Sequence, residues 1–315
     1  MSRRRSLLRF GLAAMAFLLF FLFGAVAVDP FPVYRAVMEE WLSISGGHRE
    51  VFAADDGTSL SVWVLGPLSA ERPVVLVHGL GADATYWAGT ARALVRSGRT
   101  VLVPDAPGSG RSAPPKTAAG YRLNGRVAAL DALFRALALE KADLVGHSLG
   151  GWTAAGFALS HPEKTGRLVL VDAGGFTTPA DVEAARRRVL PSDRAGARRV
   201  LALLFRRRPF PAAGFVLDAF GRNYGGGAAA ATVAALRLDD SLAGREGELP
   251  AGTAVIWGAE DTLFPLAEGR ALAAGIPEAR LFILPRAGHD GPLETPREFR
   301  GALAAALGSA PGRTK

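Results

Sequence analysis

The sequence predicts an α/β fold in which a mostly parallel sheet is covered by helices on both faces, and two observations lead to this prediction. Short apolar runs alternate along the chain with longer segments that have helical spacing. Several of the runs are apolar at every position, as expected for strands that are buried on both faces of a parallel sheet. The chain has 315 residues, of which 49% are hydrophobic, so it is long and apolar enough to bury a sheet between two layers of helices.

The strands and helices are assigned in order along the chain. Ser59–Leu65 alternates between polar and apolar residues, which predicts a half-exposed strand. Val74–Val77 and Thr100–Val103 are apolar runs that predict buried strands. The remaining predictions are helices at Thr85–Arg96, Leu123–Leu139 and Leu149–Ser160, and strands at Ala142–Val145, Arg167–Val171, Thr253–Trp257 and Arg280–Leu284.

One long stretch interrupts this alternation. Residues 176–249 contain helical patterns but no convincing strand. We interpret them as a helical cap that is inserted into a larger domain spanning residues 48–310. In open α/β sheets, ligands bind beyond the carboxyl ends of the strands, and we expect the cap to lie there. Residues 29–47 are interpreted as a connector that contains a short amphipathic helix, Val33–Leu42.

Residues 1–28 have the composition of a membrane-targeting segment. Phe10–Val28 contains 19 residues without a charge, which approaches the roughly 20 residues that span a bilayer. Four arginines precede it, at positions 3, 4, 5 and 9, and the positive-inside rule keeps such residues in the cytoplasm. We therefore expect a single-pass anchor with the remaining chain on the exported, periplasmic side. The competing interpretation is a cleaved signal peptide and a secreted protein, because Ala25–Ala27 forms an A-x-A site.

The charge and the residue types narrow the classes of partner. The net charge is +8, and arginine clusters at Arg186–Arg188 and Arg206–Arg208 contribute to it. No nucleic-acid-binding motif accompanies this charge, so we expect no nucleic-acid partner and favour an anionic membrane surface. The cap arginines fit either a membrane-facing surface or an ordinary solvated helix face. The chain has no cysteine, and its five histidines lack metal-ligand spacing, so we expect neither a metal nor a cofactor.

The motif that carries chemistry is GHSLGG, residues 146–151, which follows a predicted strand and opens a predicted helix. Gly146 and Gly150 have no Cβ, so the chain can turn very tightly between the two elements. Ser148 would then sit at the tip of a strained turn with its hydroxyl exposed, as in a nucleophile elbow. The competing interpretation is a serine that caps a helix.

A serine nucleophile needs a base, and the base needs a carboxylate to orient it. His289 lies in a loop directly after the predicted strand Arg280–Leu284. Asp261 follows the preceding predicted strand. Each residue alone could be an ordinary loop histidine or a helix cap. Together, Ser148, Asp261 and His289 occur in the serine–acid–histidine order of a catalytic triad.

Three other carboxylates lie near these positions in the sequence. Asp172 also follows a predicted strand and is the competing candidate for the acid. Glu260 is a weaker substitute for Asp261, and Asp290 is interpreted as a surface group.

The sequence HGLG at 78–81 predicts an oxyanion hole after the strand Val74–Val77. Gly79 and Gly81 have no Cβ, so the backbone can turn there and direct an amide N–H group into the site. We assign the two donors to the backbone N–H groups of Leu80 and Leu149, because such preorganised donors stabilise a developing oxyanion. His78 is interpreted as a structural histidine that supports this loop.

These motifs resemble the α/β-hydrolase superfamily. The matching segments are HGLG at 78–81, DAPGSGRS at 105–112, GHSLGG at 146–151, WGAEDTLFP at 257–265 and AGHDGPLETP at 287–296. They cover about 220 residues in the expected order. The chain looks most similar to membrane-anchored monoacylglycerol-lipase-like esterases and to cap-bearing meta-cleavage product hydrolases. The resemblance implies the triad Ser148, Asp261 and His289 and a structural role for Asp105. Ser109 departs from the histidine that the family often has there.

From these features we expect a serine hydrolase that cleaves a small lipophilic carboxylic ester, such as a monoacylglycerol, without a cofactor. The alternatives are a C–C bond hydrolase of the meta-cleavage product type, cofactor-free haloperoxidase activity and a non-catalytic small-molecule receptor. Several cap phenylalanines could line an apolar acyl pocket or form the core of the cap: Phe176, Phe205, Phe210, Phe215 and Phe220.

Overall fold

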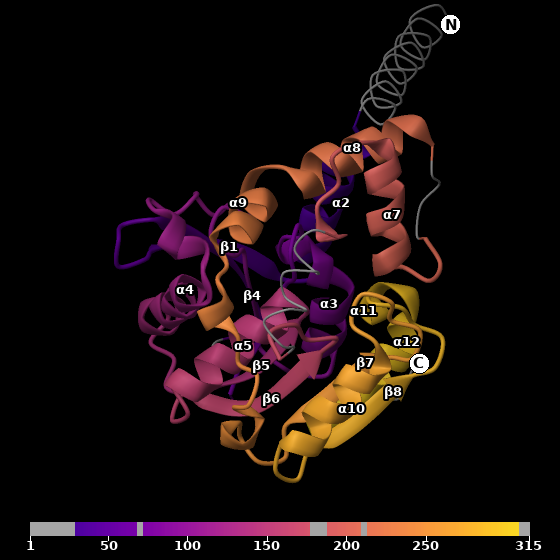
Figure 1. Ribbon diagram of the computed structural model, residues 1–315. Helices are drawn as coiled ribbons and strands as arrows, with labels where there is room; N and C mark the ends of the chain where they lie inside the picture. Colours follow the sequence, from indigo (N-terminus) through magenta and orange to yellow (C-terminus); the bar gives the residue numbers. More distant parts are fainter. Residues whose placement is uncertain (1–28, 68–71, 177–187, 209–212, 309–315) are drawn as a thin grey trace, which may run out of the picture.

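The computed structural model describes residues 29–67, 72–176, 188–208 and 213–308, and an eight-stranded sheet forms its centre (Figure 1). The strands in chain order are β1 (Gly47–Ala53), β2 (Ser59–Leu65), β3 (Val74–Val77), β4 (Val101–Pro104), β5 (Ala142–His147), β6 (Thr165–Val171), β7 (Ala254–Gly258) and β8 (Arg280–Leu284). The spatial order is β1-β2-β4-β3-β5-β6-β7-β8. Strands β1, β2 and β4 pair antiparallel, and all other pairs are parallel, so the predicted mostly parallel sheet is confirmed.

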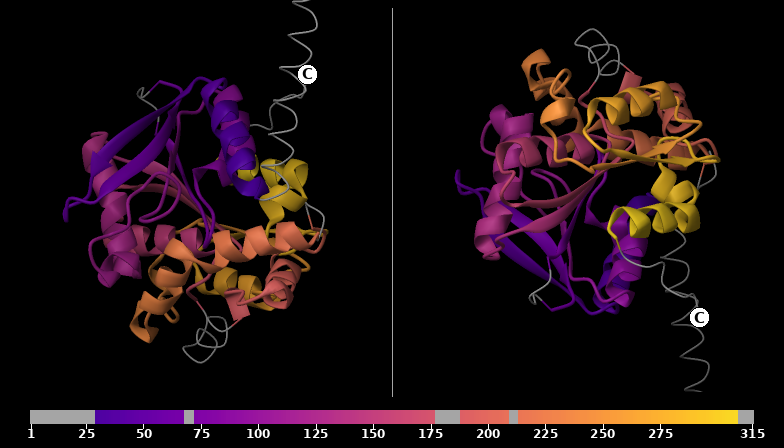
Figure 2. Two further views of the ribbon diagram at one scale, coloured as in Figure 1. Left: turned by 90° about the horizontal axis from the view of Figure 1, so that it is seen from above. Right: turned by 90° about the horizontal axis from the view of Figure 1, so that it is seen from below.

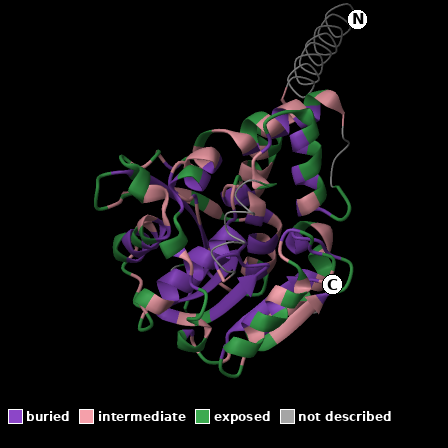
Figure 3. Cartoon of the chain, viewed as in Figure 1, coloured by how far each residue is buried: buried purple, intermediate pink, exposed green. Residues whose placement is uncertain are grey.

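Helices cover both faces of the sheet, as the views in Figure 2 show. One hydrophobic cluster joins the sheet to α4 (Leu123–Ala136), α5 (Leu149–Ser160) and α10 (Leu266–Gly275). A second cluster joins the opposite face to α2 (Pro30–Ser43), α3 (Ala88–Arg96) and α12 (Pro296–Ala306). Successive residues of a strand alternate between the two clusters, so that Val75 belongs to the first and Val74 to the second. The central strands are therefore buried on both faces (Figure 3).

Two details of the elements differ from the sequence-based expectation. Strand β1 was not predicted, because its charged sequence GHREVFA lies on the outer edge of the sheet and is only half-buried. Helix α4 ends at Ala136 rather than Leu139, and Ala138 then turns the chain with a φ of +49°. The predicted helix Val33–Leu42 forms as α2, and Asp29 caps its N-terminus by accepting a hydrogen bond from the Phe31 amide at 3.0 Å.

Between β6 and β7 the chain forms α7 (Arg194–Leu204), α8 (Gly214–Gly225) and α9 (Gly227–Ala235), followed by the short 3₁₀ turns η3 (Leu238–Asp240) and η4 (Glu246–Glu248). The described residues of this stretch contain no strand. The expected membrane segment, residues 10–28, lies outside the described part of the chain. Within that described part, no helix combines the length and apolarity that crossing a bilayer requires.

The structural role expected for Asp105 agrees with its contacts. Its buried carboxylate accepts hydrogen bonds from the backbone amides of Ala84 at 2.8 Å and Arg111 at 3.0 Å, and from Arg49 Nη1 at 3.0 Å. A Cβ on Gly110 would lie 2.2 Å from Asp105 Oδ1, so only glycine fits against this carboxylate. Asp105 thus ties the loop after β4 to the loop after β3 and to β1.

Replacing Asp105 by alanine should lower the free energy of unfolding by about 3–5 kcal/mol, because Arg49 and two amides lose a buried acceptor. Urea unfolding measures the loss. Asp55→Ala is the matched control, because Asp55 is exposed and forms a surface ion pair with Arg135, which should contribute less than about 1 kcal/mol. Equal effects of the two changes would contradict the role given to Asp105.

Candidate active site

Ser148 occupies the tight turn between β5 and α5. Its φ of +53° and ψ of −119° are strained for a residue with a side chain. The turn is possible because glycines on both sides of it let the backbone pack closely. A Cβ on Gly146 would lie 2.2 Å from the Gly150 carbonyl oxygen, and a Cβ on Gly150 would lie 2.2 Å from the Val77 carbonyl oxygen. Ser148 makes no side-chain capping bond to α5, so the competing interpretation as a helix cap is wrong.

His289 and Asp261 meet as the sequence order suggests. His289 Nδ1 lies 2.8 Å from Asp261 Oδ2, and both side chains are buried. The other oxygen of Asp261 accepts hydrogen bonds from the amides of Leu263 at 2.8 Å and Phe264 at 2.9 Å. These bonds fix the carboxylate and hold the imidazole by Nδ1. His289 Nε2, which would have to take a proton from a nucleophile, is buried and has no hydrogen-bond partner.

Burial and nearby carboxylates act in opposite directions on His289. Burial alone would lower the pKa of the imidazole, but the charge and hydrogen bond of Asp261, with smaller contributions from Asp172 and Asp290, raise it to about 9. The imidazolium is therefore strongly stabilised in this site. A base of this kind accepts a proton readily but is available in its neutral form only at raised pH.

Asp172, the competing candidate for the acid, lies nearby without contacting His289 through a hydrogen bond. Its Oδ1 accepts a hydrogen bond from the Gly258 amide at 2.7 Å, while Oδ2 is buried without a partner. Burial, followed by the charge of Asp261, raises the pKa of Asp172 well above its usual range. Asp172 is therefore harder to ionise than an ordinary aspartate, and the carboxylate that contacts His289 directly is that of Asp261.

The interpretation of Asp290 as a surface group was wrong. Asp290 is 5% exposed, and burial raises the pKa of its carboxyl to about 7. It is buried because its loop packs against α7, where the Asp290 amide donates to the Leu204 carbonyl at 3.1 Å. Glu260, the weaker substitute for the acid, instead points away and pairs with Arg206 at the surface.

His147, the residue before Ser148, has a structural role that no local pattern in the sequence indicates. Its ring stacks on Tyr86 with 5.1 Å between centroids and lies 5.0 Å from the ring of His289. Its Nε2 lies 2.9 Å from the carbonyl oxygen of His289, which makes Nε2–H the donor. Burial lowers the pKa of His147 to about 3, so this histidine stays neutral. It joins the serine turn directly to the His289 loop.

The expected oxyanion donors lie on the two segments that flank Ser148. Leu149 is the first residue of α5, so its amide is one of the helix-start amides that lack an intrahelical acceptor. Leu80 follows Gly79, where a Cβ would lie 3.2 Å from Ser148 Cβ. His78 supports this loop, as expected: its Nδ1 lies 2.9 Å from the Gly79 carbonyl oxygen, and its Nε2 accepts a hydrogen bond from the Ala106 amide at 3.0 Å.

An apolar layer from the stretch between β6 and β7 packs against these loops. We call this layer the cap cluster; from that stretch it contains Ala197, Val200, Leu201, Leu204, Phe205, Leu217, Phe220 and Tyr224, and Leu263 joins it from the loop after β7. Leu80 and Phe264 pack against it, so the cluster joins the expected oxyanion loop to the loop that carries Asp261. Phe264 also meets the His289 ring edge-on at 5.3 Å. No lysine or arginine of the described residues bonds to Ser148, Asp261 or His289.

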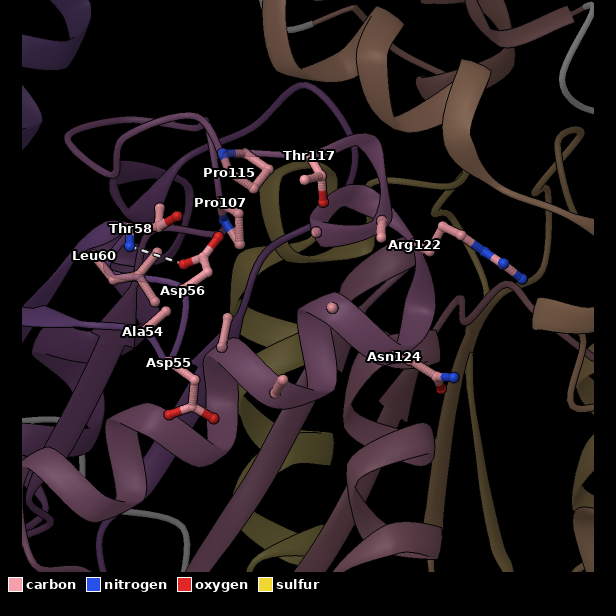
Figure 4. Close-up of a pocket in the computed structure, with 15 residues that line it drawn as sticks. Ala54, Asp55, Asp56, Thr58, Leu60, Pro107, Pro115, Thr117, Arg122 and Asn124 are labelled. Carbon is pink, nitrogen blue, oxygen red and sulfur yellow. Dashed lines mark hydrogen bonds between the residues drawn. The ribbon is translucent and has the colours of Figure 1, made fainter.

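The phenylalanines named from the sequence have different surroundings. Phe205 and Phe220 belong to the cap cluster, whereas Phe176 packs against the core cluster of the α5 face. Phe215 is 40% exposed and does not line a buried pocket. Phe210 lies outside the described residues. A surface pocket beside α4, lined by Asp56, Pro115 and Asn124 among others (Figure 4), contains none of the triad candidates.

Comparison with known proteins agrees with this fold and its motifs. Residues 72–225 match the family profile described as the alpha/beta hydrolase fold. A 2-hydroxy-6-oxononadienedioate/2-hydroxy-6-oxononatrienedioate hydrolase of Cupriavidus pinatubonensis is 31% identical over 293 residues, covering 84% of this chain and 96% of the relative.

Two solved structures are also similar. A meta-cleavage product hydrolase of Pseudomonas fluorescens has a TM-score of 0.67 and 25% identity, covering 82% of this chain and 97% of its own. A thermophilic esterase of Thermogutta terrifontis has a TM-score of 0.67 and 26% identity, covering 82% and 98%. The chain belongs to the α/β-hydrolase superfamily and is a hydrolase.

Proposed function

We propose that this chain is a serine hydrolase that cleaves carboxylic esters with an apolar acyl group. In this proposal Ser148 is the nucleophile, His289 is the general base and acid, and Asp261 orients His289. The backbone N–H groups of Leu80 and Leu149 form the oxyanion hole. The contact that carries the chemical part of the proposal is the 2.8 Å pair between His289 Nδ1 and Asp261 Oδ2. His147, the residue before the strained Ser148, hydrogen-bonds to the His289 carbonyl and so links the two loops.

The proposed reaction has two halves. Ser148 Oγ attacks the ester carbonyl carbon while His289 Nε2 takes the hydroxyl proton, and the carbonyl oxygen becomes an oxyanion held by two amides. His289 then gives the proton to the leaving alcohol, and an acyl-enzyme remains on Ser148. Water attacks this acyl group with its proton passing to His289, and the return of that proton to Ser148 releases the acid.

The cap cluster is the reason for proposing an apolar acyl group. Its aliphatic and aromatic side chains pack on Leu80, next to the proposed oxyanion hole, and on Phe264, next to His289. Arg206 is already paired with Glu260, the neighbour of Asp261 in the sequence, whereas the groups that pack on Leu80 and Phe264 are apolar. An uncharged, lipophilic ester fits these surroundings better than a charged one.

C–C bond hydrolysis is the second candidate, and a specific observation favours it. The curated relative that covers 84% of this chain is named for the hydrolysis of 2-hydroxy-6-oxo-dienedioates, and the Pseudomonas fluorescens structure is named as a meta-cleavage product hydrolase. The names of the relatives support this reaction better than they support ester cleavage. The same three side chains could serve it, since a ketone carbonyl would replace the ester carbonyl.

The two reactions are separated by a substrate series. We expect wild-type enzyme to hydrolyse p-nitrophenyl esters and monoacylglycerols, with kcat/KM rising from acetyl to longer acyl chains because the cap cluster takes up the apolar chain. A 2-hydroxy-6-oxo-dienedioate, followed by the loss of its conjugated absorbance, tests the second reaction. Ser148→Ala is measured beside the wild type and should be inactive while its unfolding midpoint is unchanged.

Each outcome of this series has a definite meaning. Turnover of the dienedioate without ester turnover would replace the ester proposal with C–C hydrolysis. Equal turnover by Ser148→Ala and wild type would contradict the nucleophile. Absence of any turnover by a correctly folded wild type would favour a non-catalytic receptor.

Asp261→Asn should lower kcat by up to about 10⁴-fold, because the amide no longer stabilises the imidazolium and does not fix its tautomer. Asp172→Asn is the matched control, since an amide has nearly the shape of a carboxyl group, Oδ2 of Asp172 has no partner, and Oδ1 can still accept the hydrogen bond from the Gly258 amide. Steady-state kinetics of the two variants gives the comparison. A larger loss for Asp172→Asn would move the role of the acid to the end of β6.

The raised pKa of His289 has a consequence for pH dependence. Because only neutral His289 can take the proton of Ser148, kcat/KM for an uncharged ester should rise as pH increases from the usual histidine value of about 6.5 towards 9. In Asp261→Asn the rise of the residual activity with pH should begin at a lower pH than in the wild type, since the main charge that raises the pKa of His289 is gone. A wild-type profile that is flat above pH 6.5 would contradict the stabilised imidazolium.

We also propose that the chain is attached to a membrane by residues 10–28, with the hydrolase domain on the periplasmic side. The support is the sequence: 19 consecutive uncharged residues follow a cluster of arginines. Complete extraction of the full-length chain from membranes by alkaline carbonate would contradict this attachment.

A further inference from the structure

The point at which the proposed membrane segment leaves the domain is fixed to α8. Asp29 directly follows residues 10–28, and its carboxylate accepts a hydrogen bond from Asn223 Nδ2 at 3.0 Å. Arg222 Nη2 lies 3.9 Å from the same carboxylate. Phe31, in the first turn of α2, packs on Phe220 with 6.4 Å between ring centroids. Figure 1 shows α2 and α8 side by side at one end of the molecule.

Helix α8 presents a mixed apolar and charged stripe on the side away from the cap cluster. Phe215 and Arg222, seven residues apart, are exposed on the same face of the helix. Between them Asp218 pairs with Arg194 of α7 at 2.5 Å. Leu217 and Phe220 point to the opposite face, where they join the cap cluster. Exposure of Phe215 is therefore a feature of the outer stripe and does not result from loose packing of α8.

The neighbouring helix α7 adds positive charge to this region. Arg198 and Arg199 are exposed on α7, while Ala197, Val200 and Leu201 face the cap cluster. Neither arginine has an ion-pair partner among the described residues. From residue 188 to residue 225 the sequence has eight arginines and only two acidic residues, both aspartates. This excess of positive charge matches an anionic surface.

We propose that the outer face of α7 and α8, defined by Arg194, Arg198, Arg199, Phe215 and Arg222, docks on an anionic lipid bilayer. The proposal rests on the membrane attachment proposed above, because Asp29 ties the end of the attached segment to α8. Once that segment is in the bilayer, α8 lies at its surface. Phe215 can then enter the headgroup region, and the exposed Arg198 and Arg199 are attracted by anionic headgroups.

This docking would deepen the proposed function. The same two helices that face the lipid on one side carry the cap cluster on the other. Their inner side chains pack on Leu80 and Phe264 beside the triad candidates. A lipophilic ester leaving the bilayer would therefore meet the cap first, and the natural substrate would be an amphiphile presented at a membrane surface.

The experiment uses the absence of cysteine in the full-length chain, which makes a single introduced cysteine a unique label site. Phe215→Cys carries an environment-sensitive fluorophore. Lys141→Cys is the control, because Lys141 is exposed and precedes the first residue of β5, whereas Ser148 follows the last. Both proteins are reconstituted into vesicles of phosphatidylcholine with one-quarter phosphatidylglycerol. Bromine-labelled lipids then quench fluorophores that enter the headgroup region.

We expect a blue shift and strong quenching at position 215, and neither at position 141. In vesicles of phosphatidylcholine alone, or with Arg198→Glu and Arg199→Glu added, the quenching at 215 should fall. Equal fluorescence at the two positions in chains that float with the vesicles would overturn the docking and leave the attachment intact.

Two further outcomes are also decisive. A blue shift at 215 in detergent that grows with protein concentration would mean that this face contacts a second copy of the chain instead, and would overturn the lipid proposal. Chains that do not float with the vesicles would overturn both the attachment and the docking. Hydrolysis of a soluble short-chain ester is measured on the same samples, so that failure of the docking is distinguished from failure of the proposed esterase activity.

Discussion

The close approach of α5 to β3 and β5 is the contact on which the rest of the site depends. Gly146 and Gly150 leave no room for a Cβ, since each would meet a carbonyl oxygen at 2.2 Å. Only this approach allows Ser148 to take a positive φ at the end of a buried strand and places the amide of Leu149 at the start of a helix. The strain at Ser148 is sustained because the parallel sheet and α5 hold both ends of the turn, and β3 brings the Gly79 loop against the serine.

The electrostatics of the site follow from burying three carboxyl groups around one histidine. Asp261 accepts hydrogen bonds from two backbone amides and contacts His289. Asp172 and Asp290 have fewer groups that stabilise a negative charge, so burial raises the pKa values of their carboxyl groups. Asp261 is thereby the best-supported of the three carboxylates and the one that contacts His289 directly. His147 adds a neutral ring and a donor under the same loop, so it fixes the position of His289 without competing for its proton.

Features encoded by neighbouring residues could be predicted from the sequence, and features created by distant packing could not. The buried strands and the turn at Ser148 were readable because apolar runs and glycine spacing are local signals. The burial of Asp290 arises from the Leu204 carbonyl of α7, some 86 residues earlier, and the ring stack on His147 needs Tyr86 from the loop after β3. Strand β1 has the charged alternation of an edge strand, which resembles a loop. Whether the enzyme cleaves an ester or a C–C bond depends on contacts with the substrate, and no local residue pattern predicts these contacts.

The central claim is that the strained Ser148 is a nucleophile activated by the His289–Asp261 pair. The most direct measurement is reaction of the folded protein with a fluorophosphonate, followed by mass spectrometry of its proteolytic peptides. We expect one phosphonyl adduct, on Ser148, that forms rapidly in the wild type and far more slowly in His289→Ala. An unmodified Ser148 in a protein that still turns over substrate would exclude Ser148 as the nucleophile, and labelling that does not depend on His289 would exclude its activation by this histidine.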